Sequence, residues 1–262
     1  MHTLAEQIRV DPATVPAPAP ITSNEAMGRG DVPIELVFFQ HDEAGTTEAF
    51  KAVDEIKPDI IAIESVSFED SDPDYVRNLE MFYDRIASGD EKFCSVIDQL
   101  PAIQQAIANG IRGSSATIKL IDRPPIDAVK DYEIAVDKFK DTMLGDRNTG
   151  NGLEAEQLQG LHDYVSGAAD MYAQREGAMA AQLEELQFQN PGKRIAAFIG
   201  QMHTPVSHIL KRDGFDMKRT FPGKARGNLE YTRADQLIRA QRLLGHVTID
   251  RGDLERVKAD LQ

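Results

Sequence analysis

The chain has 262 residues, of which 41% are hydrophobic, and its formal net charge is −14. This length and composition suit a globular protein with a sizeable core and exclude a wholly disordered chain. The negative charge argues against nucleic acid as a partner of the bulk surface. The one cysteine, Cys94, excludes an internal disulfide and a zinc site built of cysteines.

The sequence also predicts where the chain resides and how it is organised. It contains no apolar stretch of the roughly 18 residues that a membrane span needs, and residues 1–31 lack the apolar core of a signal peptide. We therefore expect a cytoplasmic protein without a membrane span. Residues 1–31, rich in Pro and Ala, are predicted to be a flexible or surface-lying lead-in. Residues 32–262 are expected to form a single α/β domain with C-terminal helices.

The first half of the chain predicts a strand–helix–strand unit followed by helices. A strand over residues 33–40 precedes a helix over 45–56, for which Thr46 or Thr47 is the expected N-cap. A continuous apolar run over residues 58–64 then indicates a second strand, of the kind found in parallel sheets covered on both faces. Further helices are predicted at 73–88 and 91–109.

The second half continues the alternation of strands and helices. A third strand is predicted at 115–124, a fourth at 193–200 and a fifth, on an edge, at 215–221. Between them and after them the pattern predicts helices at 126–144 and 153–189, a polar loop at 145–152, and two helices from residue 232 onward. The expected fold is α/β, with a central, mostly parallel sheet, helices on both faces and a helical insert.

Reactive side chains lie at or just after the ends of the four most clearly predicted strands. They are His41, Glu64, Asp122 with Arg123, and His203. Because the carboxyl ends of parallel strands meet at one edge of a sheet, these residues are expected to lie together in a crevice there. The alternative is the ordinary polarity of loops that follow strands.

The segment "GQMH" at residues 200–203 suggests how His203 reaches that crevice. Gly200 is predicted to permit a sharp turn at close approach to the neighbouring strand. A helix is then expected to begin near Thr204 and Pro205, with the proline tolerated in its first turn.

Arg175 lies on an otherwise apolar stripe of the long helix, with Met171, Met179 and Leu183 at intervals of four residues. An unpaired guanidinium buried there would be costly. We therefore expect it to pair with Glu64 or Asp122. The alternatives are that it extends to solvent or pairs with Glu176.

The sequence lacks the motifs of several other classes of enzyme and nucleotide-binding protein. The sequence has no Gly-x-Ser-x-Gly elbow, no P-loop and no dinucleotide-binding glycine fingerprint after the first strand. Residues 211–226 form a local basic cluster, expected to be a solvated face, with a site for an acidic ligand or partner as the alternative.

The order of these residues resembles the superfamily of TraB/PrgY, TIKI, ChaN and erythromycin esterase, over residues 34 to 220. The resemblance rests on "FFQH" ending in His41, "IAIE" ending in Glu64, "KLIDRP", "REGAM" beginning at Arg175, and "GQMH" ending in His203. The "LIDRP" segment is most similar to the TraB-like branch. The first Gly-x-x-His motif of the family is altered here, because Phe38 occupies the position of its glycine.

The resemblance implies a peptidase-type or esterase-type hydrolase acting on a small molecule or peptide. A divalent metal such as zinc, manganese or cobalt would be held by His41, Glu64 and His203 and would activate water. Arg175 would stabilise the developing oxyanion, with Asp122, Arg123 and Glu176 in support. In a metal-free variant a histidine would activate water, oriented by Glu64. The alternative is an inactive module of the same fold that binds a ligand, haem or peptide signal. A homo-oligomer is compatible with the sequence.

Overall fold

A computed structural model describes residues 32–64, 73–122, 126–144, 153–222 and 232–260 of the chain. The chain divides into two compact units. The first comprises Met1–Ile121 and Ala181–Gly223, and the second comprises Asp122–Ala180 and Lys224–Gln262. The predicted lead-in, the predicted loop at 145–152 and Arg123 lie outside the described residues.

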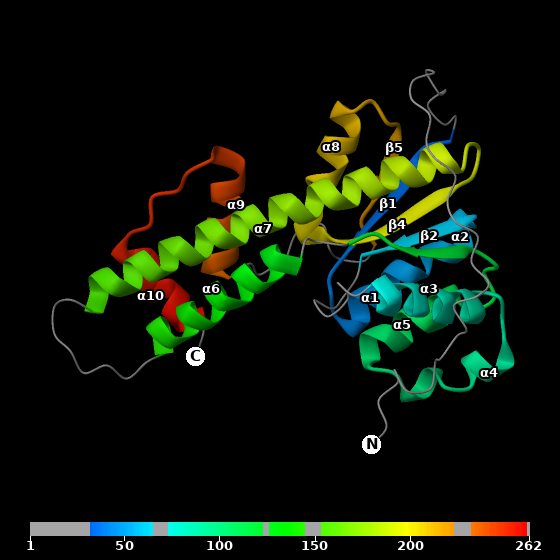
Figure 1. Ribbon diagram of the computed structural model, residues 1–262, viewed down its shortest axis with the longest axis horizontal. Helices are drawn as coiled ribbons and strands as arrows, with labels where there is room; N and C mark the ends of the chain where they lie inside the picture. Colours follow the sequence, from blue (N-terminus) through cyan, green and yellow to red (C-terminus); the bar gives the residue numbers. More distant parts are fainter. Residues whose placement is uncertain (1–31, 65–72, 123–125, 145–152, 223–231, 261–262) are drawn as a thin grey trace. The chain divides into compact units, whose positions relative to one another are not determined.

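The first unit contains a five-stranded sheet in which every pairing is parallel, as the sequence predicted (Figure 1). The order is β3-β2-β4-β1-β5, so the predicted fifth strand does lie on an edge. The central strands are buried on both faces, which is why their sequences are continuous apolar runs. The strands are β1 (Ile34–Phe39), β2 (Ile60–Ile63), β3 (Thr117–Leu120), β4 (Ile195–Gly200) and β5 (Met217–Thr220).

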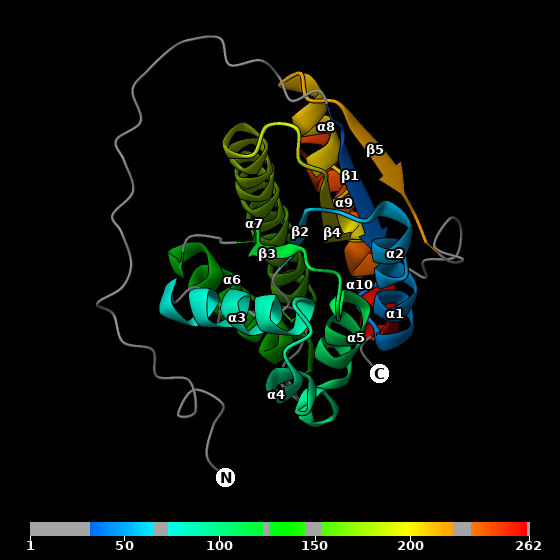
Figure 2. The ribbon, with the colours of Figure 1, turned by 90° about the vertical axis from the view of Figure 1, so that its right-hand side faces the viewer.

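Helices cover both faces of this sheet (Figure 2). One face carries α1 (Glu43–Phe50), α2 (Ala52–Ile56), α3 (Pro73–Ala87) and α5 (Ala102–Ile111). The other carries α8 (Val206–Arg212) and the turns of α7 (Leu153–Gln189) that follow Ala181. On the first face the ring of Phe50 stacks on that of Phe198, with centroids 4.2 Å apart. This contact is part of a large buried apolar cluster.

Three details of the predicted helices are wrong. The helix predicted at 45–56 is divided into α1 and α2. The N-cap of α1 is Asp42 and not Thr46 or Thr47, because the Asp42 carboxylate accepts the Gly45 N–H at 2.5 Å. Thr46 is instead fully buried. The helix predicted at 91–109 is broken into α4 (Glu91–Cys94), a short 3-10 helix η4 (Ile97–Gln99) and α5. Pro101 accounts for the separation of η4 from α5, because it has no N–H to continue a helix and its ring would clash with the preceding turn.

Strand β3 forms one edge of the sheet, and α3 covers the exposed backbone of this edge with carboxylates. Glu80 accepts the N–H of Leu120 at 2.9 Å, and Asp84 accepts the N–H of Ile118 at 2.7 Å. These acceptors are one helical turn apart, and their donors are two strand residues apart. The two spacings match, since both are close to 6 Å. Lys119 also pairs with Glu80 at 3.0 Å.

The second unit is helical. It contains α6 (Ile126–Leu144), α7 as far as Ala180, α9 (Arg233–Leu244) and α10 (Arg251–Asp260). The bounds of α6 and α7 match the prediction from the sequence. Buried side chains of these helices, among them Leu161, Val165, Leu237 and Leu254, form its core. Within the described residues, no helix of either unit is long and apolar enough to cross a membrane.

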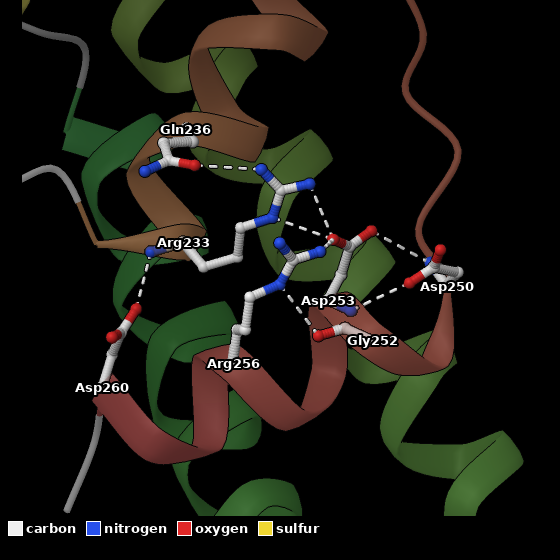
Figure 3. Close-up of polar contacts among 7 residues, drawn as sticks. All are labelled: Arg233, Gln236, Asp250, Gly252, Asp253, Arg256 and Asp260. Atoms are coloured by element: carbon white, nitrogen blue, oxygen red, sulfur yellow. Dashed lines mark hydrogen bonds and ion pairs between the residues drawn. The ribbon is translucent and has the colours of Figure 1, made fainter.

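Asp253 joins the two C-terminal helices (Figure 3). Its buried carboxylate accepts hydrogen bonds from Arg233 of α9, at 2.7 and 2.8 Å, and from Arg256 of α10, at 2.9 Å. Asp250 and Asp253 also exchange backbone-to-carboxylate hydrogen bonds at the start of α10. Burial by itself would raise the pKa of Asp253. The Asp250 N–H and the two guanidinium groups outweigh this effect and hold the pKa of Asp253 below its usual value.

Candidate functional site

The carboxyl ends of β1 and β4 form a topological switch point. From β1 the chain crosses over β4 to reach β2, whereas from β4 it crosses over β1 to reach β5. The two neighbouring strands therefore send their connections in opposite directions, and a crevice suited to ligands lies at such a point in an open parallel sheet. His41 follows β1 and His203 follows β4, so both predicted histidines belong to this position.

Glu64 lies at the centre of the predicted group in the first unit. Its backbone N–H continues the β2–β4 ladder by donating to the Phe198 carbonyl at 2.9 Å. Its carboxylate accepts the backbone N–H of Gly200 at 2.5 Å. His41 Nε2 lies 3.3 Å from Oε2, and His203 Nε2 lies 3.1 Å from Oε1. One carboxylate is therefore shared by two imidazoles and a backbone amide, from the ends of three parallel strands.

Gly200 provides the space for His41. A Cβ at position 200 would lie 2.3 Å from His41 Nε2, which is closer than Cβ atoms approach, and 3.0 Å from Glu64 Oε2, which is a tight contact. Its backbone angles, φ −58° and ψ 139°, are ordinary for any residue. Position 200 therefore needs a glycine because the backbone passes close to the His41 side chain, and not because its conformation is special. A 3-10 turn, η5 (Gln201–His203), follows, and α8 begins at Val206.

The environment of Glu64 favours its ionised form. Burial by itself would raise the pKa of this carboxyl, but the contacts with His203 and His41 outweigh burial and hold the pKa well below its usual value. A buried carboxylate with three donors around it is also a rigid one, because each donor restricts its rotation. Glu64 can therefore orient the imidazoles.

The two histidines differ in accessibility. The side chain of His203 is 3% exposed and that of Glu64 is 2% exposed, whereas that of His41 is 33% exposed. The His41 ring stacks on Phe39, with centroids 4.9 Å apart, and so has a defined orientation. His41 is therefore the member of the group that a dissolved molecule can reach.

Phe38, which stands where the TraB-like pattern has a glycine, causes no strain near His41. It is fully buried in β1, pairs with Ile199 and stacks on Phe221, with centroids 5.3 Å apart. Among the residues that the structure describes, the non-glycine residues with positive φ are Lys57 and Ser115. The backbone that leads to His41 thus needs no glycine.

Arg175 and Asp122, both in the second unit, form a pair that the sequence predicted. Arg175 is 8% exposed and donates from Nε and Nη2 to Asp122 Oδ2, the first of these at 2.9 Å. Glu176, which the sequence offered as an alternative partner of Arg175, pairs with Arg242 of α9, a residue for which the sequence predicted no role. The periodicity of a helix reveals a buried charge but does not identify a partner 66 residues away.

The residues in the first unit suit a hydrogen-bonded carboxylate better than a metal centre. Two imidazoles and a carboxylate are ligand types that zinc accepts. However, the two Nε2 atoms face different oxygens of Glu64, each at a hydrogen-bonding distance. Across the described ranges, no three His, Cys, Asp or Glu side chains form a group that could hold a metal ion.

The basic cluster is partly neutralised where it is described. Lys218 of β5 pairs with Glu35 of β1 at 2.8 Å, and Arg212 pairs with the adjacent Asp213 at 2.8 Å. Residues 223–226 of the cluster lie outside the described ranges. Both pairs are at the surface, as expected of a solvated face.

Comparisons of the chain with protein-family models, with curated proteins and with solved structures found no match.

Proposed function

We propose that the first unit is a hydrolase in which His41 activates a water molecule. Glu64 orients His41, and His203 together with the Gly200 N–H holds Glu64 in place. The observation that carries this proposal is the sharing of one buried carboxylate between a buried and an accessible imidazole, at 3.1 and 3.3 Å. The chain order of His41, Glu64 and His203, which resembles the TraB-like pattern, supports the same class of reaction.

The contact of His41 Nε2 with Glu64 supports Nδ1 as the nitrogen that acts. A neutral imidazole has one donor and one acceptor nitrogen. With Nε2–H directed at Glu64 Oε2, Nδ1 is the acceptor and takes a proton from water as general base. The negative Glu64 then stabilises the imidazolium that forms, as the aspartate does in the Ser-His-Asp triad. The imidazolium later returns the proton to the leaving group of a small-molecule ester or peptide.

Arg175 does not enter this mechanism. Its Nε and Nη2 both bond to Asp122 within the second unit, and we assign that pair to the stability of the unit. The sequence expectation that Arg175, Asp122, Arg123 and Glu176 assist catalysis stays a prediction. Activation of water by a divalent metal is the second candidate mechanism, supported by the ligand types of His41, Glu64 and His203.

The test compares single variants on a panel of p-nitrophenyl esters and fluorogenic peptides. His41→Ala should lose activity by a factor of about 10²–10⁴, the usual contribution of a general base. Glu64→Gln should also lose activity, because an amide cannot stabilise the imidazolium. His208→Ala is the matched control, since His208 is an exposed residue of α8, and it should retain full activity.

The same proteins distinguish the two mechanisms and the binding-module alternative. Elemental analysis that finds stoichiometric metal in wild type, but not in His41→Ala or His203→Ala, would support the metal route. Activity in wild type that persists unchanged in His41→Ala would refute both routes. Binding of a panel member without any turnover would indicate a module that keeps the fold and has no catalysis.

A further inference from the structure

Gln201 places a buried amide in the same turn as the proposed catalytic group. It follows Gly200 and precedes His203 by two residues in η5, and both of those residues contact Glu64. Gln201 is 6% exposed. Its Nε2 is fully buried and makes no hydrogen bond within the part of the chain that the structure describes.

The other two buried glutamines that the structure describes, Gln157 and Gln187, both have partners for their Nε2 atoms. Gln157 donates from Nε2 to the Thr142 carbonyl at 3.2 Å, and Gln187 donates from Nε2 to the Val32 carbonyl at 2.8 Å. Both are as buried as Gln201, at 5% exposure. Native proteins pair nearly all of their buried donors, so an exception next to a reactive group requires an explanation. A ligand atom that is present only during function would supply the missing acceptor.

The chemistry of an amide nitrogen specifies that atom. Nε2 carries two N–H donors and accepts no hydrogen bond, so its partner must be an acceptor such as a carbonyl oxygen. Side-chain amides are among the groups that stabilise an oxyanion as it forms during acyl transfer. A donor of this kind must lie near the general base, and Gln201 stands in the chain between Gly200 and His203, which both contact the Glu64 carboxylate.

We propose that Gln201 Nε2 donates to the carbonyl oxygen of the substrate and stabilises the oxyanion of the tetrahedral intermediate. This inference rests on the proposed function. It identifies the substrate as a carboxylic ester or amide.

The proposed reaction is the addition of water to the substrate carbonyl, followed by loss of the leaving group. The water oxygen forms a bond to the carbonyl carbon while its proton passes to His41 Nδ1. The π electron pair of the carbonyl moves onto its oxygen, where Gln201 donates. The pair then re-forms the carbonyl, the bond to the leaving group breaks, and His41 protonates that group.

The decisive variant is Gln201→Met, which is close in volume and has no donor. It should reduce kcat/KM for a p-nitrophenyl ester by about 100- to 1000-fold, the effect of removing one oxyanion donor. Its melting temperature should equal or exceed that of wild type, because the change removes a buried donor without an acceptor. The matched control is Gln157→Met, which should lower the melting temperature and leave kcat/KM unchanged.

The outcomes separate this inference from the proposed function. If His41→Ala is inactive and Gln201→Met is fully active, the assignment of Gln201 is refuted and the proposed function stands. A fall in the melting temperature of Gln201→Met as large as that of Gln157→Met would mean that the amide is already bonded, and would also refute it.

A second measurement decides the case in which wild type hydrolyses no panel member. In protein with ¹⁵N-labelled glutamine, the side-chain NH₂ signals that disappear in Gln201→Met are assigned to Gln201. Titration with acetamide, a carbonyl acceptor, should shift these signals and not those of Gln157. Signals that do not move would refute the inference without any use of turnover.

Discussion

Replacing Gly200 by alanine tests the packing that holds His41 against Glu64. The added Cβ would lie 2.3 Å from His41 Nε2 and 2.8 Å from Cδ2, whereas ordinary contacts begin at 3.4 Å. The imidazole must therefore move by about 1 Å. It has room to do so, because the His41 side chain is 33% exposed. A displacement of about 1 Å in a reacting group can reduce a rate by about 100-fold.

The effect of Gly200→Ala on stability should be smaller than its effect on activity. The backbone angles at position 200 are allowed for alanine, so the fold itself is not strained. The expected loss is about 1–3 kcal/mol, the usual range for overpacking and for one hydrogen bond to a charged group. Urea denaturation measures the loss, and ester hydrolysis together with histidine-selective NMR of the His41 ring measures the displacement.

Gly167→Ala provides the matched control. Gly167 lies within α7, and a Cβ there would meet nothing within 4 Å. Alanine should therefore stabilise the helix by up to about 1 kcal/mol and leave activity and the His41 signals unchanged. If Gly200→Ala keeps both the wild-type activity and the wild-type His41 signals, the proposed contact between Gly200 and His41 does not position the base.

Two further predictions concern buried charges. Arg175→Ala leaves the Asp122 carboxylate buried without its guanidinium and should destabilise the protein by about 3–5 kcal/mol in urea denaturation. The control is Arg77→Ala, which removes an exposed arginine and should change stability by less than about 1 kcal/mol. Equal effects of the two substitutions would contradict the pairing of Arg175 with Asp122. Because the pKa of Glu64 is lowered in the fold, its contribution to stability should be fully present above about pH 4.5 and should decline as pH falls through the lowered value. Glu64→Gln should abolish this part of the acid dependence, and an unchanged acid limb would refute the assignment.

The strands were predictable because parallel strands covered on both faces are continuous apolar runs. The strand end at Glu64 and the histidines after β1 and β4 could be found for the same reason, since a polar residue after such a run marks the carboxyl edge of the sheet. The N-cap of α1, Asp42, was harder to predict, because two threonines and an aspartate in one short segment are all acceptable N-caps. Pro101 was a usable signal for the break before α5.

Some contacts between distant residues were not predictable, although the pair of Arg175 with Asp122 was one of the two that the sequence predicted. Gly200 is a glycine because of the ring of His41, a residue 159 positions earlier in the chain, and no local pattern carries that information. The role of Asp253 depends likewise on Arg233, one helix away. Pairing of this kind is decided by packing, and the sequence of one segment does not specify which distant side chain lies against it.

The carboxylates of α3 also limit how the sheet can associate with other chains. An open strand edge recruits strands from other molecules, and at β3 the N–H groups of Ile118 and Leu120 are already occupied by Asp84 and Glu80. The opposite edge, β5, carries Lys218 and Arg219, so strands joining there would bring like charges together. A mutation that removes Glu80 or Asp84 would therefore create a site for intermolecular strand pairing, and the fibrillation of such a variant would originate from β3.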